Sequence, residues 1–159
     1  MTNTFKKTFS PSDFAASDKL AKDATIKFLE QNIPGSRVMN NMHNEFGVDL
    51  FLMLPVADEE NLYSQIPLEV EHRRSWKNKD WKFGDRMRIP GRKLKLQGAS
   101  YMVLNNDCTA AIYIPGTAQS HITFVATRYS STEEMFICYS MQDCTMLDLQ
   151  SSEIQPIKF

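Results

Sequence analysis

The first long pattern in the chain is that of a helix. Between Asp13 and Gln31, apolar residues recur on one helical face, namely Phe14, Ala21, Ala24 and Phe28. Ser12 has the side chain of a good N-cap, and the turn-forming residues Asn32, Pro34 and Gly35 would end the helix. Residues 1–10 carry no such pattern, and we expect a loose N-terminal arm there.

After this helix, short apolar runs alternate with turn-forming residues, which predicts strands. Val48 to Leu54 is almost continuously apolar, as is typical of a strand covered on both faces. Pro67 to Glu71 predicts a short second strand, and Asp58–Asn61 predicts a turn before it. Residues 37–46 form a polar extended segment that is either a strand or a loop. We further expect a short helix or turn at Arg92–Leu96 and four strands, at Tyr101–Asn105, Ala110–Ile114, Ile122–Ala126 and Met135–Tyr139.

The order of these elements predicts the fold class. A helix, strands, a short helix and more strands are typical of an α/β or α+β domain, with a central mixed β-sheet flanked by helices. The 159 residues are enough to bury one core, and no flexible linker divides them. We therefore expect a single domain over residues 1–159, with the last dozen residues wrapping its surface.

Composition adds expectations about the compartment. No apolar run approaches the roughly 18 residues that a membrane span needs, and the N-terminus lacks the apolar core of a secretory signal. The three cysteines, Cys108, Cys138 and Cys144, have neither a close pair nor a zinc-site spacing. An odd, unpatterned set suits a reducing compartment. We expect a cytoplasmic protein, in the host cell if it is viral, without a membrane partner.

Charge is distributed unevenly along the chain. Ten of the 18 lysines and arginines lie between Arg73 and Lys95, against only Asp80 and Asp85, so this segment carries +8 and the remainder −9. Such a segment can present a phosphate-binding face although the net charge is −1. It can equally be a solvated surface.

Three carboxylates lie in apolar surroundings. Asp49 stands within Val48–Leu52, and Glu69 and Glu71 alternate with Leu68 and Val70. Side chains two positions apart on a strand share a face about 7 Å apart, so these two glutamates would repel each other unless a cation lay between them. If the two strands pair, Asp49 completes an oxygen site suited to Mg²⁺ or Mn²⁺. A solvent-facing strand and a salt-bridged Asp49 are the alternative interpretations.

The arrangement resembles the PD-(D/E)XK nuclease superfamily. A helix precedes an apolar strand with one Asp, and a nearby strand reads acidic-x-acidic, at Asp49 and at Glu69-Val70-Glu71. Together with Ile89-Pro90-Gly91-Arg92-Lys93 and Asn105-Asn106-Asp107, the string looks like phage-type members. The resemblance implies a restriction-endonuclease-like core. It also implies that Asp49, Glu69, Glu71 and the carbonyl of Val70 hold the metal at an opened sheet edge.

The chain departs from the family pattern at two positions. Val48 replaces the motif's proline, and Glu71 occupies the place of its lysine, as in the Glu-x-Glu variants of some restriction enzymes. Lys93 is the candidate for a lysine that has moved, with Arg73 as the second choice. Glu30, near the end of the first helix, is a candidate for the accessory helix-borne carboxylate that many members have.

The resemblance implies a divalent-metal-dependent endonuclease or exonuclease that hydrolyses phosphodiester bonds, with DNA favoured over RNA. Glu71 or Lys93 would orient the attacking water, and the flanking phosphates would meet basic side chains, those of Arg73, Arg74, Lys77, Arg92 and Lys93. A homodimer would bring one site to each strand. Two other classes remain open: a catalytically inactive nucleic-acid-binding protein on the same fold, and a viral accessory protein-interaction module whose carboxylates form a structural network.

Overall fold

In the computed structural model of the chain, residues 10–41, 47–96, 98–126 and 132–159 are described, and they begin with a helix, α1 (Pro11–Asn32). The predicted helix is confirmed, but its N-cap is Ser10 rather than Ser12. The side chain of Ser10 accepts a hydrogen bond from the backbone N–H of Asp13, and Pro11 occupies the first turn. Proline fits there because the first helical N–H groups have no partner within the helix.

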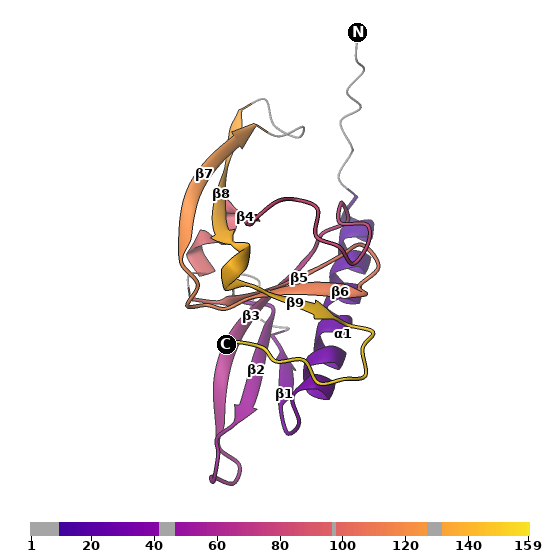
Figure 1. Cartoon of the computed structure of the whole chain (residues 1–159), viewed down its shortest axis with the longest axis vertical. Helices are drawn as coiled ribbons and strands as arrows, with labels where there is room; N and C mark the ends of the chain where they lie inside the picture. Colours follow the sequence, from indigo (N-terminus) through magenta and orange to yellow (C-terminus); the bar gives the residue numbers. More distant parts are fainter. Residues whose placement is uncertain (1–9, 42–46, 97, 127–131) are drawn as a thin grey trace.

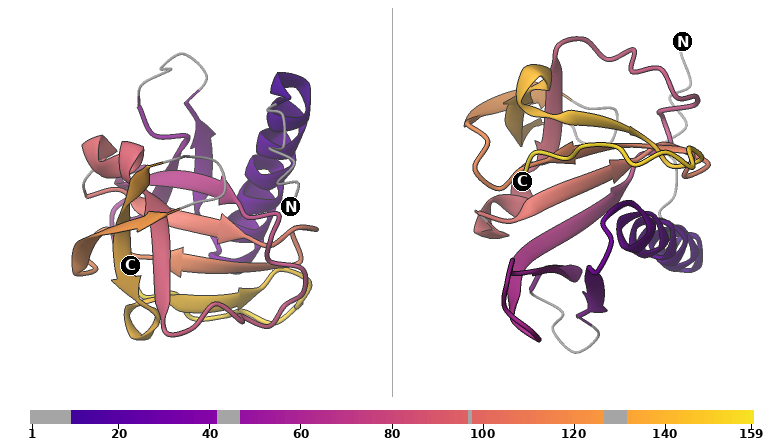
Figure 2. Two further views of the ribbon diagram at one scale, coloured as in Figure 1. Left: turned by 90° about the horizontal axis from the view of Figure 1, so that it is seen from above. Right: turned by 60° about the horizontal axis from the view of Figure 1, so that its bottom comes forward.

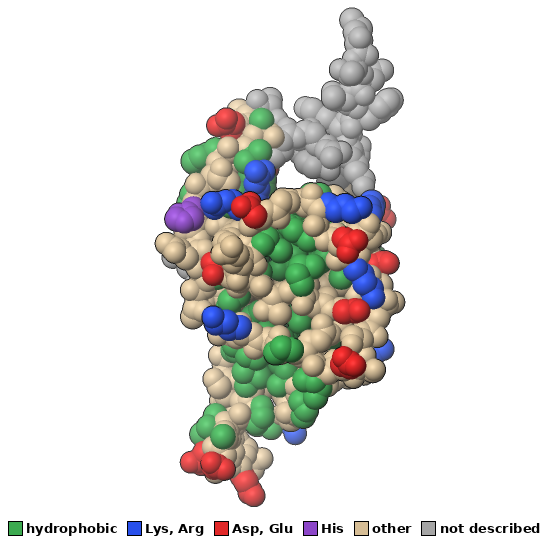
Figure 3. All heavy atoms as spheres, viewed as in Figure 1, with side chains coloured by type: hydrophobic (Ala, Val, Ile, Leu, Met, Phe, Trp, Pro, Cys, Tyr) green, Lys and Arg blue, Asp and Glu red, His purple; other side chains and the backbone are tan. Residues whose placement is uncertain are grey.

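Six strands form the larger sheet, in the order β1-β2-β3-β5-β6-β9 (Figure 1). They are β1 (Arg37–Asn40), β2 (Leu50–Pro55), β3 (Tyr63–His72), β5 (Ser100–Leu104), β6 (Ala110–Ile114) and β9 (Thr145–Asp148). The β3–β5 pair is parallel and the other pairs are antiparallel. The sheet is therefore mixed, as the order of elements predicts. The predicted acidic turn joins β2 to β3, at the lower tip of the molecule, where acidic side chains gather (Figure 3).

Three further strands form a second sheet in the order β4-β8-β7, with β4 (Arg86–Pro90), β8 (Glu133–Ser140) and β7 (Ser120–Ala126). The predicted short helix is present as the 3₁₀ helix η1 (Gly91–Leu96), and η2 (Met141–Asp143) precedes β9. Strands β4 and β9 are not predicted by the sequence pattern. In β4, exposed arginines alternate with the buried residues Met87 and Ile89, so the segment has no apolar run that would predict a strand.

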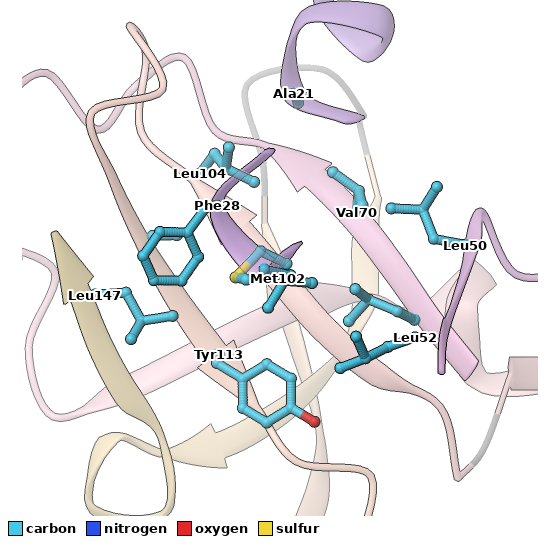
Figure 4. Packing of buried hydrophobic residues seen from close by; sticks show 12 residues of the cluster. Ala21, Phe28, Leu50, Leu52, Val70, Met102, Leu104, Tyr113 and Leu147 are labelled. Atoms are coloured by element: carbon cyan, nitrogen blue, oxygen red, sulfur yellow. The ribbon is translucent and has the colours of Figure 1, made fainter. Parts of the chain in front are cut away.

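The two faces of the larger sheet carry two hydrophobic cores. Alternate residues of β5 show this, because Met102 and Leu104 pack toward α1, whereas Tyr101 and Val103 pack toward the second sheet. Figure 2 shows α1 against one face of the larger sheet and the β4-β8-β7 sheet against the other. Figure 4 shows the α1-side core, to which side chains of α1, β2, β3, β5, β6 and β9 contribute. The chain is thus a single α+β domain. Its described helices include none with the length and apolar character that a membrane crossing requires.

The turn between β5 and β6 is built around Asn105, which is fully buried. Its Oδ1 accepts hydrogen bonds from the backbone N–H groups of Thr109 and Ala110, and its Nδ2 donates to the carbonyl oxygen of Asn78. Asn106 and Asp107 lie in the turn itself. The side chain of Asn105 stabilises this turn and ties it to the loop before β4.

We expect Asn105→Ala to lower the free energy of unfolding by about 1–3 kcal/mol, because it leaves buried backbone donors without an acceptor. Urea denaturation followed by circular dichroism measures this difference. Asp107→Ala is the matched control on the same turn, since Asp107 is exposed. Equal stability of the Asn105 variant and the unmodified chain would contradict a structural role for this side chain.

Candidate active site

The carboxylate of Asp49 lies where β2 and β3 separate. Strand β2 begins at Leu50, opposite Leu68, so Asp49 precedes the strand and the prediction that it lies inside it is wrong. Its Oδ2 accepts a hydrogen bond of 2.8 Å from the backbone N–H of Val70, taking the place of a strand partner. A side chain can do this only where the sheet opens. Asp49 and Glu69 therefore meet where the pairing of β2 and β3 ends.

Glu69 is the most deeply buried of the three carboxylates, with a relative exposure of 3%. Its Oε2 accepts a 3.3 Å hydrogen bond from the backbone N–H of Asp49, so the two residues are bonded to each other's segments. Its Oε1 forms an ion pair with Lys93 of η1. A buried carboxylate requires such partners, because its desolvation is otherwise uncompensated. Lys93, the candidate for a lysine that has moved, thus lies beside Glu69.

Glu71 lies on the same face of β3 as Glu69, two residues further along. Arg73 donates to its Oε1 at 3.1 Å and to the carbonyl oxygen of Arg88 at 2.6 Å, which links the larger sheet to β4. Its other oxygen, Oε2, is buried and has no hydrogen-bond partner among the described residues. Burial of Tyr101 raises the pKa of its hydroxyl far above the usual range. The neighbouring Tyr139 and Glu71 raise this pKa further.

Two residues of α1 complete the cluster, and the sequence pattern did not indicate either of them. The ammonium of Lys22 lies 3.1 Å from Oδ1 of Asp49 and 2.9 Å from Oδ2 of Asp18. Burial lowers the pKa of Lys22. The hydrogen bonds with Asp18 and Asp49 and the negative charges of these two residues outweigh burial, so the pKa is raised overall. The i,i+4 spacing of Asp18 and Lys22 was visible in the sequence. Their approach to Asp49 depends on how α1 packs on β3.

These groups line a pocket of about 1160 Å³ between the N-terminal half of α1, the ends of β2 and β3, and η1. Six acidic and six basic side chains face it; they are Asp13, Asp18, Asp23, Asp49, Glu69, Glu71, Lys19, Lys22, Arg73, Arg74, Arg92 and Lys93. The pocket is therefore balanced in formal charge rather than basic. A balanced pocket binds a phosphate through specific contacts rather than through overall attraction.

The other predicted basic residues occupy different positions around this pocket. Arg92 is exposed at its edge, and Arg74 lines it while donating a hydrogen bond to the carbonyl oxygen of Asp13. Lys77 faces a second, shallower pocket near His72 and Arg74 instead. Glu30 is exposed on α1, about 12 Å along the helix axis beyond Lys22, and does not line the pocket. Asp18 and Lys22, rather than Glu30, are the residues of α1 that lie beside the three carboxylates.

His72 and Trp76 hold the surrounding backbone. His72 projects to the face opposite Glu71, where its ring nitrogens contact the hydroxyl of Ser17 and the carbonyl oxygen of Asn106. Trp76 is buried in the core between the two sheets, and its indole N–H donates to the carbonyl oxygen of Asp80. Positions 1–9 of the expected N-terminal arm and positions 42–46 of the expected 37–46 segment lie outside the described residues.

The oxygens at this edge have the donor chemistry that Mg²⁺ and Mn²⁺ prefer. The buried, unpartnered Oε2 of Glu71 also points to a missing cationic or donor partner. Within the described ranges, however, no three acidic, histidine or cysteine side chains already surround one point closely enough to hold an ion. Each of the three carboxylates has a basic partner beside it, so Lys22 or Lys93 would have to move for an ion to reach Asp49 or Glu69.

Comparisons of the chain with models of protein families, with curated proteins and with solved structures find no match.

Proposed function

We propose that the chain is a divalent-metal-dependent nuclease that hydrolyses phosphodiester bonds in nucleic acid, with DNA favoured over RNA. One observation carries the proposal. The side chain of Glu69 accepts a hydrogen bond from the backbone N–H of Asp49, and the side chain of Asp49 accepts one from the backbone N–H of Val70. Lys93 forms an ion pair with Glu69 at the same place. Acidic side chains from two adjacent strands and a nearby lysine are what the PD-(D/E)XK resemblance requires, here with the lysine supplied by η1.

Asp49, Glu69 and the free oxygen of Glu71 would hold Mg²⁺ or Mn²⁺, with the Val70 carbonyl as a further oxygen donor. The chemistry that the bound ion supplies is activation of water and neutralisation of charge on the phosphate. Lys93 would orient the attacking water and donate a hydrogen bond to a phosphate oxygen. Arg92, exposed at the rim, and Arg74 would bind flanking phosphates. Arg73 is held by Glu71 and Arg88, so its predicted role becomes one of positioning Glu71.

The test is a cleavage assay with plasmid and with labelled single- and double-stranded DNA and RNA, in Mg²⁺, Mn²⁺ or EDTA. We expect cleavage that requires the metal and that falls at least 10²–10³-fold, by order of magnitude, in an Asp49→Ala/Glu69→Ala variant. Glu30→Ala is the matched control, because it removes an exposed carboxylate outside the pocket. Cleavage that persists in EDTA or in the double variant would contradict the proposal.

A second candidate is a nucleic-acid-binding protein that does not cleave. It is favoured by the pairing of every carboxylate of the cluster with a basic side chain, which a purely structural network would also show. This candidate predicts salt-dependent binding of nucleic acid without cleavage in any metal. Binding without cleavage by the folded, unmodified chain would therefore favour it over the nuclease.

A further inference from the structure

Lys22 contacts two carboxylates that belong to different parts of the fold. Asp18 lies one turn earlier on α1, at 2.9 Å, and Asp49 lies at the opened sheet edge, at 3.1 Å. Only one of these two, Asp49, belongs to the proposed metal site. The ammonium group is thus shared between a residue of the site and a residue outside it.

A divalent ion and the ammonium of Lys22 compete for Oδ1 of Asp49. The other oxygen of Asp49 already accepts the backbone N–H of Val70, so Oδ1 is the oxygen that an incoming ion would use. The side chain of Lys22 is 21% exposed, so little water can solvate its ammonium group once the group has left Asp49. Asp18, whose side chain is 34% exposed, already contacts the ammonium and can remain its partner without a change in the helix.

We propose that Lys22 is a positioning residue that sets the affinity of the site for divalent metal, by releasing Asp49 and keeping its ion pair with Asp18 when an ion binds. The inference rests on the proposed function, because it concerns the same metal site. Lys22 neutralises Asp49 until the ion arrives, and Asp18 stabilises the displaced ammonium. Asp18 therefore promotes metal binding although it does not contact the metal.

The same helix provides a matched control. Lys19 and Asp23 form an i,i+4 ion pair at 2.6 Å, with side chains 78% and 59% exposed, and both also line the pocket. Unlike Lys22, neither of them forms an ion pair or hydrogen bond with Asp49 in the part of the chain that the structure describes. Substitutions at Lys19 and Asp23 reproduce the change of charge on the helix without the competition at Oδ1.

The experiment is calorimetric titration of the full chain with Mn²⁺. Lys22→Met is expected to bind Mn²⁺ about tenfold more tightly than the unmodified chain, and Asp18→Asn about tenfold more weakly. In a Lys22→Met background, Asp18→Asn should have little further effect, because no ammonium remains to be displaced. Lys19→Met and Asp23→Asn should stay near the unmodified affinity. Circular dichroism melting confirms that each variant is folded.

Opposite shifts for Lys22→Met and Asp18→Asn, with unchanged controls, would support the inference, since a merely structural ion pair predicts no such opposition. If the unmodified chain binds Mn²⁺ and the Lys22 and Asp18 variants bind it equally well, the inference is overturned and the proposed nuclease stands. If neither the unmodified chain nor any variant binds Mn²⁺, the inference and the metal site of the proposed function are overturned together.

Discussion

Lys93→Met is expected to reduce phosphodiester cleavage by about 10²–10³-fold, the range for removal of one preorganised electrostatic group. The same change is expected to lower the free energy of unfolding by about 3–5 kcal/mol, because it leaves the buried carboxylate of Glu69 without its cation. The two effects have different causes. Single-turnover cleavage in Mg²⁺ measures the first, and urea denaturation measures the second.

A second substitution separates these effects. In the Lys93→Met/Glu69→Gln variant no uncompensated charge remains at the buried position, so most of the lost stability should return while cleavage stays absent. Arg92→Met is the neighbouring control, since Arg92 is exposed at the pocket edge and its loss should leave stability within about 0.5 kcal/mol. Recovery of cleavage in the double variant would contradict both the role of Lys93 in cleavage and the role of the Glu69 carboxylate as a metal ligand.

Trp76→Ala is expected to lower the free energy of unfolding by about 3–5 kcal/mol, as large-to-small changes of buried aromatic residues do. Trp76 is 1% exposed and packs edge-on against Trp81, at 5.4 Å between ring centroids. It fills the core between the two sheets, and its loss leaves a cavity beside β4. Urea denaturation followed by far-ultraviolet circular dichroism measures the change without depending on tryptophan fluorescence.

Phe83→Ala is the control for this prediction. The ring centroids of Phe83 and Trp81 lie 4.9 Å apart, but Phe83 is 49% exposed, so its removal creates no buried cavity. The free energy of unfolding should therefore fall by about 0.5 kcal/mol or less. A Trp76 variant that kept full stability but lost affinity for single-stranded oligonucleotides would instead indicate a base-stacking role. Such a result would contradict the packing seen here.

Local patterns of apolar and turn-forming residues are enough to predict part of this fold. Helix α1, the strands β5 and β6 and the acidic turn between β2 and β3 all follow from the periodicity of apolar residues and from turn-forming residues. Strand β6 was predicted with its observed bounds, Ala110–Ile114, because a short apolar run between turns has few alternatives. The location of Glu69 and Glu71 on the same face of their strand followed from strand alternation alone.

Other features were decided by contacts between distant segments. Strand β4 pairs with β8 about fifty residues later, and the charges that alternate along it conceal its buried face. The position of Asp49 just before β2 depends on where the ladder with β3 ends, since its carboxylate takes the place of a strand partner. Local propensity contains no information on such long-range pairing.

The candidate site shows the same division. The sequence indicated Asp49, Glu69, Glu71 and Lys93 because charges in apolar runs and one motif are readable along the chain. The tertiary structure alone brought Asp18 and Lys22 to Asp49, and it placed Glu30 outside the pocket. The reason is geometric: the side of α1 that meets the opened edge depends on how the helix packs on β3, and helical periodicity gives only its apolar face.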